Sequence, residues 1–385
     1  GTPPDISIDP VDPGDNGGDA GNDGGTVADG DTGMQTGYDS VGFTIGFELF
    51  DEESIEELAE RAARQAVTKL RARPAPSGAM PVVIKCGSGG VLFHEAFWYE
   101  NPGPEAARRP DARWRRHLVS PRVFGEAPQF LDIDGDGRPE ILAISGTAAS
   151  DKLKQWGWYA PDWSAPTKPW RFVAVTEPGE YNHYYHGEGV GDINGDGRAD
   201  LVLNEGWWEQ PPKSAPPGTP WRKHPFVFSD DRGGAQILVA DVNGDGRNDV
   251  ITAKNAHGWG LSWFEQTRDA AGAISFREHR IMGNREEEAR FGVAFSQPHA
   301  LTLADLDGDG LPDIVTGKRR WAHGPKGDVE PMATPVNYAF LLRRDAAAPG
   351  GARYVPRLID DASGLGTQVV AVDVNRDGVP DVLTA

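Results

Sequence analysis

Five short acidic segments of this chain have the residue types and spacing of a metal-binding loop. In each, a carboxylate or amide side chain stands at positions one, three and five, a carboxylate stands at position nine, and glycines separate most of them. Alternate positions direct these oxygens into one tight turn, and position seven can add a backbone carbonyl. Several hard oxygen donors without a soft donor suit Ca²⁺. The pattern therefore predicts five calcium sites.

The spacing assigns the calcium ligands. In chain order they are Asp132, Asp134, Asp136, the Arg138 carbonyl and Glu140; Asp192, Asn194, Asp196 and Asp200; Asp241, Asn243, Asp245 and Asp249; Asp305, Asp307, Asp309 and Asp313; and Asp373, Asn375, Asp377 and Asp381. The fifth loop is expected to bind most weakly, because Arg376 stands where the other loops have glycine. Two alternatives remain: tight turns without a metal, and an EF-hand, whose closing acid comes three positions later and precedes a helix.

A second set of polar residues lies at matching offsets from these loops. If one strand leads into each loop and the next strand returns, the residues at the far ends of both strands meet at the opposite end of the unit, here called the upper face. That set contains Glu126, His186, His299, Gln236, Gln368, Asn204, Lys254, Asn255, His257, Lys318, Arg319, Trp321 and His323. Such groups could bind a sugar or an anion, ligate a transition metal, or perform acid–base chemistry. The alternative is a set of ordinary loop-bonding groups around a solvated funnel.

Within this set, six residues are the candidate ligand-binding site: Glu126, His186, His257, His299, Lys318 and His323. They include four of the nine histidines of the chain. The sequence contains no Ser-His-Asp order, phosphate loop or HExxH motif that would assign a catalytic role.

The elements that must position these residues repeat along the chain at a spacing of roughly 60 residues. Each unit has a short apolar segment before the loop and another after it, followed by two aromatic segments such as GWWEQ and WRKHPF. Four strands per unit predict an all-β fold, a β-propeller with about six or seven four-stranded blades in the intact protein. The recurring Trp158, Trp207, Trp208 and Trp263 are expected to pack the core, with sugar stacking as the alternative.

The sequence divides into three parts. Residues 1–40 are rich in Asp, Gly and Pro and predict a disordered acidic spacer. Residues 41–80 predict a short helical segment, at 51–71, followed by a linker and a degenerate loop at 73–81. Residues 81–385 predict the propeller, whose last unit ends after two strands, and this suggests a truncated C-terminus.

Composition restricts the possible partners. Lys and Arg number 38 against 58 Asp and Glu, and the net charge of −20 argues against nucleic acid or an anionic membrane as partner. The single cysteine, Cys86, excludes an intramolecular disulfide and a cysteine-based zinc site. No apolar run is long enough to predict a transmembrane segment.

These repeats resemble the FG-GAP/VCBS repeat family, whose members are calcium-stapled β-propellers that include the head of the integrin α-subunit. The resemblance covers residues 81–385 and departs from the pattern at Arg376 and at the missing first loop. It implies a secreted protein, extracellular or periplasmic, and we expect a monomer that binds a carbohydrate or protein ligand. The alternative is a sugar-acting lyase similar to aldos-2-ulose dehydratase, with a histidine as base and Lys318 stabilising negative charge.

Overall fold

The computed structural model of the 385-residue chain describes residues 6–8, 22–29, 33–40, 95–109, 111–146, 152–182, 184–216, 218–229, 233–234, 236–319, 323 and 326–384. The predicted helix at 51–71, the degenerate loop at 73–81 and Cys86 lie outside these residues. The chain forms two compact units, one of residues 1–81 with 101–115 and one of residues 82–100 with 116–385.

The first unit contains three antiparallel strands in the order β1 (Ile6–Ile8), β2 (Asn22–Asp29) and β3 (Gly33–Ser40), together with α2 (Pro104–Ala107). Asp29 pairs with Gly33, so only three residues connect β2 and β3. The structure thus has strands in a segment for which composition predicts a disordered spacer. Gly and Asp are also hairpin-turn residues, and composition alone does not distinguish the two uses.

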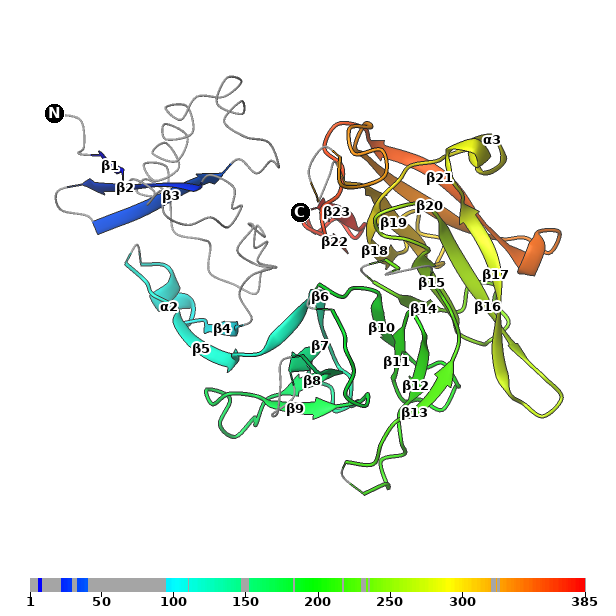
Figure 1. Cartoon of the computed structure of the whole chain (residues 1–385), viewed down its shortest axis with the longest axis horizontal. Helices are drawn as coiled ribbons and strands as arrows, with labels where there is room; N and C mark the ends of the chain where they lie inside the picture. The colour runs from blue at the N-terminus through cyan, green and yellow to red at the C-terminus, as the bar shows by residue number, and fades with distance from the viewer. Residues whose placement is uncertain are drawn as a thin grey trace. The chain divides into compact units, whose positions relative to one another are not determined.

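The second unit consists of short antiparallel sheets that follow one another along the chain (Figure 1). The four complete sheets are β6 (Val123–Leu131), β7 (Glu140–Gly146), β8 (Lys154–Ala160) and β9 (Arg171–Ala174); β10 (Glu188–Gly191), β11 (Asp200–Leu203), β12 (Gly206–Glu209) and β13 (Arg222–Pro225); β14 (Leu238–Ala240), β15 (Asp249–Ala253), β16 (Leu261–Arg268) and β17 (Ile274–Met282); and β18 (Pro298–Ala304), β19 (Asp313–Lys318), β20 (Val336–Arg344) and β21 (Ala352–Asp360). Two-stranded sheets precede and follow them: β4 (Ala96–Glu100) with β5 (Arg115–Ser120), and β22 (Val369–Val372) with β23 (Asp381–Thr384).

Helical segments are few in the described part of the chain. They are η2 (Arg285–Glu287) and α3 (Glu288–Phe291) after β17, η3 (Pro349–Gly351) before β21, and α2 of the first unit. None of the helices described is long and apolar enough to cross a membrane.

The first strands of consecutive sheets lie side by side, which is the arrangement of blades in a propeller (Figure 1). Strand β10 contacts β14, β14 contacts β18, and β18 contacts β22. Glu188 of β10 forms a parallel bridge with Gln236, and the Ile237 amide donates to the Glu188 carbonyl at 2.7 Å. The Gln129 side chain of β6 donates to the same carbonyl at 2.8 Å. The predicted β-propeller of four-stranded blades is therefore confirmed.

Each large apolar cluster lies between two consecutive blades. Trp156 and Trp208 belong to the cluster of the β6–β9 and β10–β13 blades, Trp207 and Phe264 belong to the next cluster, and Trp263 belongs to the third. Trp158, Trp207, Trp208 and Trp263 are between 2% and 7% exposed. The prediction that these tryptophans pack the core is confirmed, and they present no exposed face on which a sugar could stack.

A Trp–His–Glu arrangement joins the last two strands of three sheets. His279 stacks on Trp263 with ring centroids 4.4 Å apart, and its Nε2 lies 2.8 Å from a carboxylate oxygen of Glu265. The equivalent sets are Trp207, His224 and Glu209, and Trp98, His117 and Glu100. This packing explains why the aromatic segments recur with a histidine at the same offset.

Substituting His279 by Ala is expected to lower the free energy of unfolding by about 1–3 kcal/mol, because it removes the ring stacked on Trp263 and the bond to Glu265. Urea denaturation followed by tryptophan fluorescence measures this change. The control is Arg277→Ala on the same strand, which removes an ion pair to Glu265 from a side chain that is 66% exposed. The control should change stability by less than about 0.5 kcal/mol. Equal losses in the two variants would contradict a structural role for the stack.

Candidate functional site

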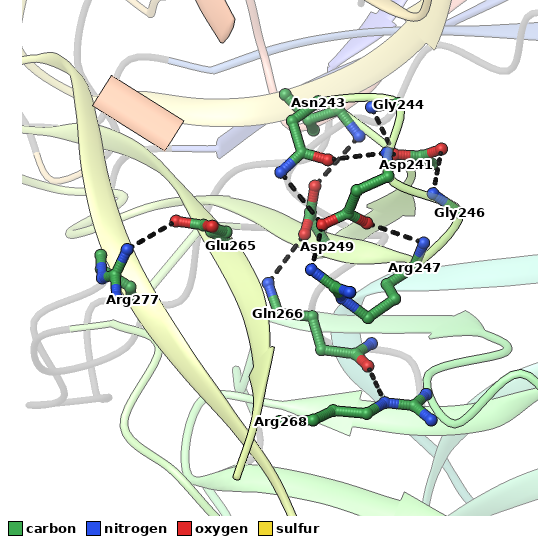
Figure 2. Close-up of polar contacts among 12 residues, drawn as sticks. Asp241, Asn243, Gly244, Gly246, Arg247, Asp249, Glu265, Gln266, Arg268 and Arg277 are labelled. Atoms are coloured by element: carbon green, nitrogen blue, oxygen red, sulfur yellow. Dashed lines mark hydrogen bonds and ion pairs between the residues drawn. The ribbon is translucent and has the colours of Figure 1, made fainter. Parts of the chain in front are cut away.

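The position-one carboxylate organises each predicted calcium loop. In the third loop, Oδ1 of Asp241 accepts from the amides of Gly244 at 2.7 Å and Asp245 at 3.2 Å, and Oδ2 accepts from Gly246 at 3.1 Å (Figure 2). Gly244 and Gly246 have φ angles of 81° and 79°, a region that favours glycine. The glycines are therefore required by the turn itself, and the turn faces the acidic side chains toward one another.

The closing acid at position nine is buried beneath the loop. Asp249 is 0% exposed; one of its oxygens accepts from the Val242 amide at 3.0 Å and the other accepts from the Gln266 amide at 2.8 Å. Asp200 and Asp313 make the equivalent pairs of bonds. Burial raises the pKa of Asp249 to about 7, although its backbone hydrogen bonds oppose the shift.

The loops differ in which oxygens they bring together. Ligand atoms of Asp132, Asp134 and Asp136 lie within 4.8 Å of one another, and so do those of Asp305, Asp307 and Asp313. Burial and neighbouring carboxylates raise the pKa of Asp134, because several like charges share this small volume. All carboxylates assigned to calcium lie in the described residues, and their oxygens are the donors that Ca²⁺ prefers.

The fifth loop keeps the same turn with a less suitable residue. Arg376 has a φ angle of 67°, where the other loops have glycine, and its amide donates to Asp373 Oδ1 at 2.5 Å. Asp381 accepts from the Val374 amide at 2.9 Å. The left-handed backbone at Arg376 supports the expectation that this loop holds calcium less firmly than the others.

Two glutamine side chains and one arginine connect the first three loops to the next blade. Gln266 donates its backbone amide to Asp249 of its own loop, while its Nε2 donates to the Ile193 carbonyl of the preceding loop at 2.7 Å. Gln210 makes the corresponding bonds to Asp200 and Ile133. In the β18–β21 blade, Arg344 performs this link through the Asp241 carbonyl, at 2.9 Å. Consecutive loops among the first four predicted calcium loops are thus joined through direct hydrogen bonds.

At the upper face, three histidines from three blades meet. His186 precedes β10, His257 follows β15, and His299 lies in β18. The Nε2 atoms of His186 and His257 are 3.1 Å apart, and the ring of His299 lies 4.6 Å from that of His186 and 5.4 Å from that of His257. Each of the three offers one nitrogen within 4.8 Å of the others. The structure therefore places these residues, predicted from their offsets, in one histidine cluster.

Acidic and basic side chains surround the histidine cluster. A carboxylate oxygen of Glu126 lies 3.5 Å from His299 Nε2. Oδ1 of Asp328 lies 3.2 Å from His257 Nδ1 and 2.8 Å from His323 Nδ1. Arg319 places a guanidinium nitrogen 2.8 Å from His257 Nδ1 and 3.7 Å from Asp328. Asp328 thus connects two histidines and an arginine, and the site carries groups of both charges.

Burial keeps the three clustered histidines neutral. His186 is 1% exposed and His299 is 0% exposed. Desolvation lowers the pKa of His186 to about 2 and that of His299 well below its usual value, and it also lowers the pKa of His257. Neither ring nitrogen of His299 has a hydrogen-bond partner among the described residues. Such a buried polar group costs roughly 1–3 kcal/mol, so the position requires an explanation.

Lys318 lies beside this cluster, but its ammonium is already engaged. Its side chain is fully buried, Nζ donates to the Arg319 carbonyl at 3.0 Å, and burial lowers its pKa to about 8. Asn204 supports the site from behind by donating to the His186 carbonyl at 3.2 Å. His323 is the most exposed member, with 53% of its side chain accessible. Trp321, also predicted at the upper face, lies outside the described residues.

Sequence reasoning missed two residues of the site. Asp328 lies in the irregular segment between β19 and β20, which has no counterpart in the other repeats. Gln297, two residues before His299, adopts a φ of 60° and accepts from Arg319 Nε at 3.3 Å. Neither residue belongs to the periodic pattern, so neither could be predicted from its distance along the chain to a loop.

Comparison with known proteins identifies the repeats. The FG-GAP-like repeat family matches residues 132–203 and 241–316. The blades are FG-GAP-like repeats. Each match begins at the first Asp of a predicted calcium loop, so the FG-GAP-like repeat includes the loop together with the strands that flank it.

Other matches lie in a different region of this chain or cover a small part of the matched protein. The PmbA/TldA metallopeptidase central domain family matches residues 18–70, outside the FG-GAP-like repeats. A metalloprotease of Methanothermobacter thermautotrophicus is 44% identical over 70 residues, which is 18% of this chain and 15% of that protein. The Photorhabdus luminescens Tc holotoxin pore is similar over 75% of this chain and 12% of that chain, at 18% identity and a TM-score of 0.31. None of these matches supports the lyase alternative.

The first prediction from the loops concerns calcium. Removal of calcium with EDTA is expected to lower the melting temperature, because several carboxylates in one loop repel one another without a cation and an ion bound only by the folded state stabilises it. Differential scanning fluorimetry with EDTA, and again after excess Ca²⁺, measures the loss and its recovery. A melting temperature indifferent to both additions would contradict calcium binding by the FG-GAP-like repeats.

The second prediction concerns the glutamine links. Gln266→Ala is expected to lower the free energy of unfolding by about 2–3 kcal/mol, since it leaves the buried carbonyls of Ile193 and Asn248 without their donor. The control Gln155→Ala removes a single bond within one blade, to the Thr176 carbonyl, and should cost about 1 kcal/mol. Urea denaturation in saturating calcium compares them. If Gln266→Ala costs no more than the control, the link between blades has no energetic importance.

Proposed function

We propose that this chain is a secreted, calcium-stabilised β-propeller that binds a carbohydrate or protein ligand at the histidine cluster of its upper face. The observation that carries the proposal is the convergence of His186, His257 and His299 from three separate blades. A propeller needs only apolar contacts and hydrogen bonds between neighbouring first strands to join its blades. The structure has both between consecutive blades. Two buried imidazoles and a third that is partly exposed therefore exceed what the scaffold requires.

The free hydrogen-bonding capacity of the cluster supports ligand binding. His299 has two unbonded ring nitrogens and His186 has an unbonded Nδ1 among the described residues, while Glu126 is close enough to contribute a carboxylate. Hydroxyl or carboxylate groups of a ligand would satisfy these atoms. Binding pockets of this type combine a preformed framework with a few convergent polar groups.

Calcium acts in this proposal as the structural cofactor of the propeller. The donors in each loop are carboxylate and amide oxygens with the spacing that Ca²⁺ prefers, and the net charge of the chain is −20. Extracellular calcium modules bind the ion with dissociation constants of roughly 10⁻⁴–10⁻³ M, which suits exposed loops of this kind.

The proposed location follows from the repeats and the charge. FG-GAP repeats are typical of extracellular proteins. A large negative charge also disfavours self-association, and we therefore propose a monomer in solution. Analytical ultracentrifugation of the calcium-loaded chain reports its mass directly.

The test of ligand binding uses a glycan array and saturation-transfer NMR with neutral sugars, sugar acids and short peptides. The variants are the double substitution His186→Ala with His299→Ala, and the single substitution His323→Ala, whose side chain is more exposed. We expect each to weaken binding at least about tenfold, while calcium-dependent melting changes little. His224→Gln serves as control, because this histidine stacks on Trp207 in the core, away from the cluster. Undiminished binding by both cluster variants would exclude this site.

A further inference from the structure

The relative placement of the clustered histidines has the dimensions of a metal site. Nε2 of His186 and Nε2 of His257 are 3.1 Å apart, and one nitrogen of His299 lies within 4.8 Å of both. In a tetrahedral zinc site with Zn–N bonds of about 2.0–2.1 Å, two ligand nitrogens are separated by about 3.3 Å. A single ion between the rings therefore needs only small side-chain adjustments.

The hydrogen bonds of His257 can hold it in the form that a metal requires. Asp328 can only accept at His257 Nδ1, whereas Arg319 can only donate to the same atom. When Nδ1 carries the proton and donates to Asp328, the lone pair of Nε2 points toward His186. A carboxylate that orients a histidine in this way is the usual outer partner of a metal ligand.

The second, independent observation is the lack of partners for buried ring nitrogens. His299 is completely buried and neither of its nitrogens is hydrogen-bonded to any residue that the structure describes, and Nδ1 of His186 is in the same condition. An ion bound to these rings would use the otherwise unpaired lone pair of His299.

The charges around the cluster are compatible with a divalent cation. Glu126 and Asp328 supply carboxylates on two sides, and they oppose the guanidinium of Arg319. The donor set is nitrogen-rich, unlike the oxygen-only calcium loops, and imidazole ligands select zinc over calcium.

We propose that His186, His257 and His299 bind one Zn²⁺ ion, with Asp328 as the positioning residue of His257 and Glu126 or a ligand oxygen at the fourth coordination position. This inference rests on the proposed function, because it takes the histidine cluster as the ligand-binding site and adds the ion through which a hydroxyl or carboxylate of the ligand is held. Three protein ligands and one open position are the pattern of zinc sites that accept an exogenous group.

The test uses the full chain with its calcium loops saturated, so that oxygen sites do not compete for the added metal. Isothermal titration with ZnCl₂ and elemental analysis after dialysis should give one Zn²⁺ per chain. His257→Gln and His299→Gln should weaken zinc binding by more than about 100-fold, and Asp328→Asn should weaken it by about 10–100-fold. His224→Gln should leave it unchanged.

X-ray absorption of the zinc-loaded wild-type chain gives a readout that does not depend on the folding of any variant. Scattering from several imidazoles supports the proposal. A shell of oxygen atoms only, no retained zinc in excess calcium, or equal zinc affinity in the wild type and in a folded His257→Gln variant overturns it.

Repeating the ligand screen with and without zinc separates this inference from the proposed function. Ligand binding by a chain that takes up no zinc would overturn the metal site and leave the proposed function standing. Imidazole-bound zinc in a chain that binds none of the screened ligands would support the metal site and overturn the proposed ligand-binding function.

Discussion

The buried carboxylate at position nine of the first four loops is the interaction on which the rest of the propeller depends. Asp249 accepts one amide from its own loop and another from the third strand of its blade. This single side chain therefore fixes the distance between the acidic turn and the sheet beneath it. Without it, the loop would lose its attachment and the first two strands would lose the register that also sets the position of their opposite ends.

That register connects the two ends of each blade. The strand that leads out of the fourth loop, β19, ends at Lys318, and the strand that leads into it, β18, contains His299. Strands β18 and β19 pair regularly from Leu301 to Ala304, next to the loop, and their register shifts between Pro298 and Leu301, so His299 stands at an irregularity of the strand pair. His186 and His299 each stand six residues before the first Asp of their loops, and His257 follows the second strand of a third blade, so the cluster combines both kinds of strand end.

Periodic features of the sequence were enough to predict the blades, the loops and the convergence of His186, His257 and His299. Each of these predictions rests on a local pattern that recurs in several units, so a unit that is ambiguous alone can be interpreted from the others. The residues that sequence reasoning missed lack this support. Asp328 reaches the site through an irregular connection, and Gln297 depends on a left-handed backbone that its residue type does not predict.

The strands at 22–40 and the role of Gln266 show a second limit of prediction from the sequence. Composition suggested a spacer where the structure has a hairpin, because Gly and Asp serve both uses. The glutamine was visible in the aromatic segments, but its significance lies in contacts with the preceding repeat, which no single unit reveals. Contacts between repeats, rather than within them, were the information that the pattern lacked.

The chain of glutamine and arginine links also makes the propeller a one-dimensional array with nearest-neighbour coupling. The first three loops contact the next blade through Gln210, Gln266 and Arg344, so ordering of one of these loops favours docking of its neighbour. If calcium binds these loops as proposed, occupancy at one loop would change the free energy of the adjacent one. Calcium uptake along such an array would then be cooperative, with a sharpened threshold in ion concentration.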